Sequence, residues 1–232
     1  MSSRAVKFLL DLLFPPRCAF CGKLMKPEEK DGLCAVCQEK LPWILGAAAE
    51  QKPEFISLCV SPLWYQGEVR ESVRRYKFYG RSGYADTYGL LVAQCVQDHL
   101  AGRFDLITWA PLSRERRKER GYDQAMLLAQ AAAQRLGCTA SATLQKVRNT
   151  GAQSGLHDDS ARRANVLGAY ELTVPVEGRR VLLIDDVVTT GSTLSECARV
   201  LRTGGAADVV CATLARARGK REDTRKNSDQ RS

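Results

Sequence analysis

The sequence predicts an α/β protein with a central, mostly parallel sheet flanked by helices, preceded by a small cysteine module. Patterns of buried strands at residues 106–111, 181–184 and 207–215 alternate with patterns of amphipathic helices. Strands that alternate with helices are typical of a parallel sheet covered on both faces. Four cysteines within residues 18–37 fall in two close pairs, a spacing that suits a metal site.

The remaining elements follow from apolar periodicity and from residues that end helices. A short amphipathic helix is expected at residues 6–14, ended by Pro15 and Pro16. Further apolar patterns predict a strand at 55–65 and helices at 68–79, 84–100, 122–136 and 193–202. No internal repeat interrupts this order.

Composition narrows the class of protein and its partners. With 232 residues, 44% of them hydrophobic, the chain can bury one α/β core and a small appendage. Its net charge of +9 favours anionic partners such as phosphorylated metabolites, nucleic acid or a membrane surface. No apolar run is long enough for a transmembrane segment, so we expect a soluble, cytoplasmic protein. Five further cysteines are scattered among apolar neighbours, as buried reduced thiols are: Cys59, Cys95, Cys138, Cys197 and Cys211.

A buried strand, two acids, a loop of small residues and a helix follow one another within residues 181–202. Ligands of open α/β sheets bind outside the carboxyl ends of the strands, so Asp185 and Asp186 would face the crevice. Their oxygens accept hydrogen bonds, which suits the hydroxyls of a ribose. The loop places hydroxyls and Gly191 at the start of a helix, where backbone N–H groups and the helix dipole favour a phosphate. A receiver-like acidic pair is the alternative, while a Walker-type loop is disfavoured because Gly-Lys-Ser/Thr is missing from the motif.

The motif VLLIDDVVTTGST resembles the signature of type I phosphoribosyltransferases, which bind 5-phospho-α-D-ribosyl 1-diphosphate (PRPP). The resemblance implies the type I phosphoribosyltransferase fold, with Asp185 and Asp186 on the ribose hydroxyls. It assigns the 5-phosphate to the loop made of Thr189, Thr190, Gly191, Ser192 and Thr193. Mg²⁺ would accompany PRPP and neutralise the diphosphate.

Two other segments are expected to line the same crevice. The strand at 106–111 leads into a loop where Leu112, Ser113 and Arg114 are candidates for holding the diphosphate. The basic run that begins there has a second interpretation as a solvated helix start, which stays open for individual arginines. Residues 146–165 form a long polar segment, and such a length inside a compact domain is typical of a lid. A lid would exclude water from a transition state resembling a ribosyl cation.

Three stretches taken together resemble the ComF family, bacterial proteins associated with DNA uptake and use. They are PLS followed by RGYDQ before a helix, RNTGAQSGL followed by RRAN, and LLIDDVVTTGST. The resemblance extends over nearly the whole chain. The family's pattern Arg-Gly-Phe-Asn-Gln appears here with Tyr122 in place of Phe and Asp123 in place of Asn. It implies lid positions for Arg148, Thr150, Gln153, Leu156, Arg162 and Asn165.

The N-terminal cysteines form two Cys-x2-Cys pairs, Cys18 with Cys21 and Cys34 with Cys37, with twelve residues between the pairs. This spacing lets four thiolates converge on one Zn²⁺, which would be structural because the protein fills every coordination position. Duplication of the pair disfavours a redox motif, and an iron site stays open. The module would either bind nucleic acid or a partner, or brace the second domain.

Two functions remain in competition. One is an enzyme that transfers phosphoribosyl from PRPP to an unidentified small-molecule acceptor. The other is a PRPP-binding protein of DNA uptake that binds single-stranded DNA or a DNA-uptake helicase, which the family resemblance favours. The expected organisation is an N-terminal helix (1–16), a zinc-ribbon-like module (17–50), a phosphoribosyltransferase-type domain (51–217) and a disordered basic tail (218–232).

Overall fold

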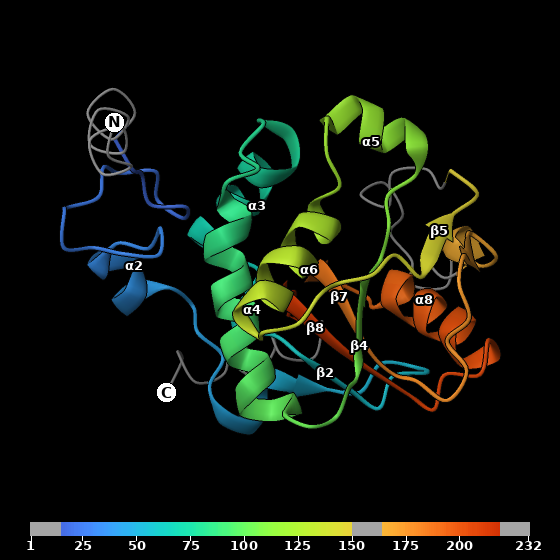
Figure 1. The fold of residues 1–232 in the computed structure, drawn as a ribbon. Helices are drawn as coiled ribbons and strands as arrows, with labels where there is room; N and C mark the ends of the chain where they lie inside the picture. Colours follow the sequence, from blue (N-terminus) through green and yellow to red (C-terminus); the bar gives the residue numbers. More distant parts are fainter. Residues whose placement is uncertain (1–14, 150–163, 219–232) are drawn as a thin grey trace, which may run out of the picture.

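The computed structural model describes residues 15–149 and 164–218 of the chain (Figure 1). The predicted helix at 6–14, most of the predicted lid and nearly all of the predicted tail therefore lie outside the described residues.

The sheet is mostly parallel, as predicted, and its strands follow the order β1-β2-β8-β7-β4, with β3 also paired to β8. Only β1 is antiparallel to its neighbour among these pairs. The strands are β1 (Glu50–Gln51), β2 (Leu58–Val60), β3 (Leu63–Trp64), β4 (Leu106–Trp109), β7 (Arg180–Val188) and β8 (Asp208–Arg216). The single strand predicted at 55–65 is thus two short strands that pair with successive parts of β8.

Helices cover both faces of the sheet (Figure 1). The helices are α2 (Ala35–Lys40), α3 (Gly67–Phe78), α4 (Tyr84–Leu100), α5 (Arg114–Arg120), α6 (Gln124–Arg135) and α8 (Ser192–Thr203), with a 3-10 turn at Gly46–Ala49. α3, α4 and α6 pack on one face, and α8 packs on the other with the antiparallel pair β5 (Leu144–Lys146) and β6 (Tyr170–Leu172). The basic run at 114–120, whose conformation the sequence left open, is the helix α5.

Side chains alternate between these two faces along the central strands. Leu182 and Ile184 pack toward α3, α4 and α6, whereas Val181 and Leu183 pack toward α8. Because both faces are covered, the central strands read as continuous apolar runs in the sequence. Four of the five scattered cysteines are buried as predicted, but Cys138 is exposed because it lies in the turn after α6, outside the helix layer.

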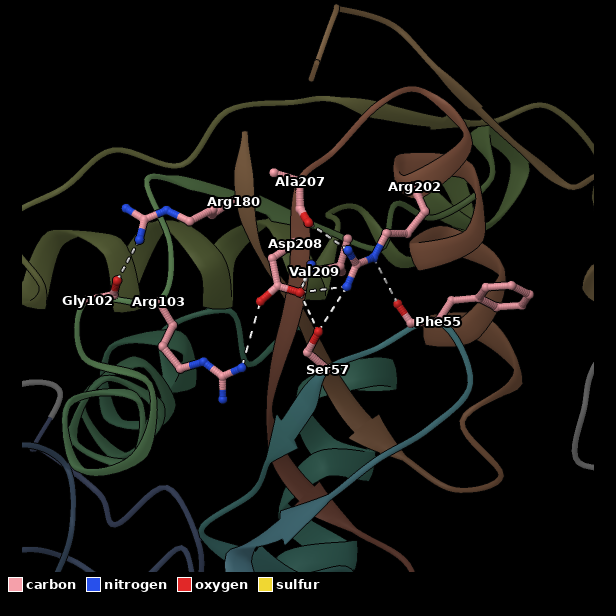
Figure 2. A network of polar contacts seen from close by, with 9 residues as sticks. All are labelled: Phe55, Ser57, Gly102, Arg103, Arg180, Arg202, Ala207, Asp208 and Val209. Carbon is pink, nitrogen blue, oxygen red and sulfur yellow. Dashed lines mark hydrogen bonds and ion pairs between the residues drawn. The ribbon is translucent and has the colours of Figure 1, made fainter. Parts of the chain in front are cut away.

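The amino-terminal ends of the strands carry a network of ion pairs (Figure 2). Asp208 accepts a hydrogen bond from the hydroxyl of Ser57, pairs with Arg202 at 2.6 Å, and lies 3.8 Å from an Arg103 nitrogen. Asp105 pairs in the same way with Arg179 and Arg180. Each carboxylate at this edge is therefore held between two arginines.

Candidate functional site

A polar cavity of about 200 Å³ opens at the carboxyl ends of β4 and β7, the edge where ligands of open α/β sheets bind. It is lined by residues from six elements and the loops between them: Tyr65, Lys77, Ala110, Pro111, Leu112, Arg116, Arg120, Lys146, Tyr170, Asp185, Asp186, Val187, Thr189 and Thr193. The acidic pair and the loop after it, which the sequence singled out, thus border one cavity.

The acidic pair lies within β7 and not after it, so the prediction that the strand ends at residue 184 is wrong. β7 continues to Val188 because β8 pairs with it over the same length. Neighbouring side chains of a strand point to opposite faces. Asp186 accordingly meets Lys77 of α3, with 2.7 Å between Nζ and Oδ1, while a carboxylate oxygen of Asp185 accepts from the Asp186 backbone N–H at 2.8 Å.

Both carboxylates border the cavity, where Asp186 is buried and Asp185 is partly buried. Burial, followed by the negative charge of Asp186, raises the pKa of Asp185 to about 7. Lys77 opposes this rise because its ammonium lies at the same cavity wall. The pair can therefore accept hydrogen bonds from a sugar, and one member changes charge near neutral pH.

The loop after the acidic pair ends at the start of α8. Gly191 is the N-cap of this helix and has a φ of 78°, a left-handed conformation that favours glycine. The hydroxyls of Thr190 and Ser192 are hydrogen-bonded to each other at 2.8 Å, whereas Thr189 and Thr193 line the cavity. The first backbone N–H groups of a twelve-residue helix thus lie beside the cavity, an arrangement that suits a phosphate.

Asp123 holds the loop after β4 through a hydrogen bond that the sequence did not predict. One oxygen of Asp123 accepts from the Leu112 backbone N–H at 2.9 Å, and the other caps α6 through the Met126 N–H at 3.1 Å. Ser113 is buried and caps α5 by accepting from the Arg116 N–H at 3.4 Å. A carboxylate at a helix N-cap is a common sequence signal, but its second partner depends on tertiary structure.

The residues proposed for the diphosphate take different positions. Leu112 borders the cavity. Ser113 is buried, Arg114 is exposed, and neither belongs to the cavity wall. Arg116 and Arg120, two and six residues further along α5, line the cavity instead. The basic run therefore contributes through the helix face and not through its first residue.

Two lysines of the cavity wall gave no separate signal in the sequence. Lys77 comes from α3, and Lys146 comes from β5 on the opposite side of the sheet. Burial lowers the pKa of Lys146 to about 8, and its Nζ lies 5.1 Å from the centre of the Tyr170 ring. Together with Arg116 and Arg120, these lysines make the cavity wall rich in positive charge.

The two ends of the predicted lid are tied to each other. Arg148 donates to the backbone oxygens of Asn165 at 3.1 Å and of Leu167 at 2.6 Å. Thr150, Gln153, Leu156 and Arg162 lie outside the described residues. Residues 149 and 164 are therefore anchored near the same point, beside Ser113, whose hydroxyl donates to Asn149 at 3.3 Å.

The four N-terminal thiols converge as predicted. The Sγ atoms of Cys18, Cys21, Cys34 and Cys37 all lie within 4.8 Å of one another, and those of Cys21 and Cys34 are 3.7 Å apart. Sulfur atoms around a tetrahedral Zn²⁺, each about 2.3 Å from the metal, would be separated by about 3.8 Å. The donor set and its geometry therefore fit a structural zinc ion.

The cysteine module is packed into the core of the main domain. Phe20 is fully buried and its ring lies 5.5 Å from that of Tyr88 in α4. The backbone oxygens of Ala19 and Phe20 accept from Ser72 and Arg75 of α3. A Cβ on Gly32 would lie 2.1 Å from the Thr87 hydroxyl, so glycine permits the close approach to α4. These contacts support a bracing role for the module.

Known proteins share this combination of modules. Residues 9–50 match the double zinc ribbon domain and residues 123–230 match the phosphoribosyl transferase domain. The DNA utilization protein YhgH of Salmonella typhimurium is 34% identical over 210 residues, which cover 85% of this chain and 90% of that protein. The chain belongs to the ComF family. Its competence members include competence protein F of Haemophilus influenzae, 31% identical over 81% of this chain and 92% of that protein, and competence protein ComFC of Bacillus subtilis, 26% identical over 83% and 87%.

ComF membership and the sheet order together establish the predicted fold class. This ComF chain has a type I phosphoribosyltransferase-like α/β fold with an N-terminal four-cysteine zinc ribbon. Within residues 15–149 and 164–218, no helix is long and apolar enough to cross a membrane.

Proposed function

We propose that this ComF protein binds PRPP, or a related ribose phosphate, in the cavity at the carboxyl ends of β4 and β7. One observation carries the proposal: an acidic pair and a helix N-terminus border the same cationic cavity. Separately, each feature is common, but a ribose 5-phosphate is a ligand that needs both.

The residues divide among the parts of such a ligand. Asp185 and Asp186 accept from the ribose hydroxyls, and Thr189 to Thr193 hold the 5-phosphate through hydroxyls and backbone N–H groups. Arg116 and Arg120 of α5 face the side of the cavity that remains for the diphosphate. The carboxylate oxygens also suit Mg²⁺, which would neutralise diphosphate charge when bound with the ligand. Residues 148–165 are proposed to act as the lid.

Calorimetric titration with PRPP and Mg²⁺ tests this proposal. The wild-type protein should bind, and the double variant Asp185→Ala, Asp186→Ala should not. Ribose 5-phosphate and diphosphate, titrated separately, should each bind more weakly because each occupies one part of the cavity. Absence of heat and of a thermal shift in the wild type would refute PRPP binding.

The family relationship supports a role in DNA uptake or utilisation. Relatives of this chain are named DNA utilization and competence proteins. We propose that this protein engages single-stranded DNA or a DNA-uptake helicase, with PRPP acting as substrate or effector. Affinity for an oligonucleotide should fall steeply with salt, since released counterions drive such binding. A flat salt dependence would discard direct DNA binding.

A second candidate function is phosphoribosyl transfer to a small acceptor. The observation that favours it is the position of Asp185 beside Asp186 in the cavity wall, where burial raises its pKa to about 7 and so suits a group that exchanges a proton near neutral pH. Release of diphosphate from PRPP in the presence of candidate acceptors tests transfer. Binding without any diphosphate release would leave PRPP as an effector.

A further inference from the structure

Two neighbouring aromatic side chains are exposed at the end of α3. Phe78 is 61% exposed and Tyr79 is 57% exposed. The only other aromatic side chain of comparable exposure among the described large hydrophobic residues is Phe55, at 44%, beside the opposite edge of the sheet. More than half of the surface of each residue is therefore open to solvent.

Arginines lie over both rings. The Arg120 guanidinium lies 4.8 Å from the centre of the Phe78 ring, and that of Arg74 lies 5.2 Å from the centre of the Tyr79 ring. Arg74 also donates to the Tyr79 hydroxyl at 3.0 Å. These contacts hold the rings in place, so little side-chain freedom remains to be lost when a ligand stacks on them.

The surroundings of the rings are strongly basic. The last part of α3 with the turn after it (residues 71–81) and α5 (residues 114–120) carry nine Lys and Arg against three Glu. Arg120 joins the two segments, since it belongs to α5 and stacks on Phe78 of α3. Both segments lie at the same end of the molecule (Figure 1). We call residues 71–81 and 114–120 the α3/α5 face.

We infer that the α3/α5 face binds single-stranded DNA, with bases stacked on Phe78 and Tyr79 and phosphates on the cations of α5. Exposed rings among cations are the combination by which proteins bind single strands, because every base has a face to stack and every nucleotide has a phosphate. A duplex would offer the phosphates but not the base faces. The inference rests on the proposed role in DNA utilisation and names the surface that serves it.

The opposite edge of the sheet shows why charge alone does not select this surface. Arg103, Arg179, Arg180 and Arg202 are also clustered there, but they pair with Asp105 and Asp208. Figure 2 shows the contacts of Asp208 with Arg103 and Arg202. On the α3/α5 face, Arg117 and Lys118 are exposed on a helix with only two acidic residues. Trp64 also has two arginines over its ring, but it is only partly exposed. Among the described residues, two adjacent exposed rings that each lie beneath an arginine are found on the α3/α5 face.

The test is fluorescence anisotropy of the full-length protein with a thymidine oligonucleotide of about 20 nucleotides, enough to span one binding groove. The variant Phe78→Leu, Tyr79→Leu keeps apolar volume but removes both rings. It should bind the oligonucleotide at least roughly fivefold more weakly, the loss expected for one stacked base. An abasic strand of equal length should bind the variant and the wild type alike. Phe55→Leu is the matched control and should change neither affinity.

The charge of the face is tested with Arg117→Ala, Lys118→Ala, which leaves the residues of the cavity wall intact. The slope of log affinity against log salt should fall by about 1.4, since each phosphate contact on a single strand contributes about 0.7. The comparison variant is Lys23→Ala, Lys26→Ala, Lys30→Ala in the zinc module, which should leave the slope nearly unchanged.

Three outcomes would overturn the inference: no binding by the wild type, unchanged affinity of the Phe78, Tyr79 variant, or loss of binding only with the zinc-module variant. A PRPP titration of the same proteins separates this result from the ligand proposal. If PRPP binds and the ring variant leaves the DNA affinity unchanged, the proposed DNA surface is refuted and the proposed PRPP site stands. If PRPP does not bind and the ring variant weakens DNA binding, the PRPP site is refuted and the DNA surface stands.

Discussion

The two edges of the parallel sheet use the same residue types in opposite ways. At the amino-terminal edge, Asp105 and Asp208 are each held between two arginines, and Figure 2 shows the pair around Asp208. At the carboxyl-terminal edge, Asp185 and Asp186 are adjacent, and Lys77 pairs with one of them. The first edge pairs its carboxylates within the fold, whereas the second collects like charges in a cavity.

The pKa values of the carboxyl groups differ accordingly. Hydrogen bonds from Arg179, with those from Arg180, hold the pKa of Asp105 below its ordinary value. Burial would raise the pKa of Asp208, but the hydrogen bond from Ser57 and the charge of Arg202 outweigh it and lower the pKa. Asp185 shifts upward instead, to about 7. One edge therefore stabilises the fold through its carboxylates, and the other keeps an unfavourable arrangement that a ligand can relieve.

The largest expected effect is on ligand binding at the carboxyl-terminal edge. Asp186→Ala should weaken PRPP binding by roughly 100-fold, because a charged acceptor for the ribose hydroxyls is worth about 1.5–3 kcal/mol per hydrogen bond. Calorimetric titration measures this loss. Asp208→Ala, at the other edge, should bind PRPP with unchanged affinity, and an equal loss in both variants would remove the distinction between the edges.

The matching experiment at the amino-terminal edge measures the stability of the fold. Asp208→Ala should lower the free energy of unfolding by about 2 kcal/mol, because it leaves partly buried hydrogen-bond donors of Ser57 and Arg202 without their acceptor. Urea denaturation gives the value. Asp98→Ala is the control, since Asp98 is exposed and accepts one side-chain hydrogen bond, from Gln94. A loss no larger than that of the control would show that the network contributes little.

Stability should depend on pH through Asp185 in a predictable direction. Its raised pKa means that the folded protein binds the proton more tightly than the unfolded chain, so this group favours folding less as pH rises from about 4 to about 7. Asp185→Asn should therefore raise the free energy of unfolding by roughly 1–3 kcal/mol at about pH 8 and hardly change it at about pH 4. Denaturation at both pH values tests this, and an equal gain at both would contradict the assignment.

The smallest expected effect concerns the loop that Asp123 braces. Asp123→Asn keeps one oxygen, which can accept from the Leu112 or the Met126 N–H, and replaces the other oxygen with an NH2 group, which cannot accept from the remaining N–H. Unfolding free energy should fall by about 1 kcal/mol, and PRPP affinity should fall a few-fold because the loop beside the cavity loses its anchor. Asp86→Asn, near the start of α4, is a helix-terminus control without a contact to this loop. Unchanged PRPP affinity in Asp123→Asn would show that the loop needs no such anchor.

The features that depend on local pattern could be predicted from the sequence. Alternating strands and helices predicted the parallel sheet, the Cys-x2-Cys pairs predicted the converging thiols, and the contiguous motif brought Asp185, Asp186 and the loop after them to one cavity edge. These succeed because the periodicity, the spacing and the strand-loop-helix order all act within a short stretch of chain.

The distant residues that complete the site come together through the packing of the whole fold. β7 extends past the acidic pair because β8 lies beside it. Lys77 contacts Asp186, which lies 109 residues later in the chain, because α3 packs on the sheet. Arg116 and Arg120 face the cavity where Arg114 was expected, since the direction of a side chain on α5 depends on how the helix packs. The stacking of Arg120 on Phe78 likewise depends on how α3 and α5 pack. Contacts between residues far apart in sequence leave no local pattern, so the sequence could name the ribose-phosphate motif and the basic run of residues 114–120, but not which cations line the cavity.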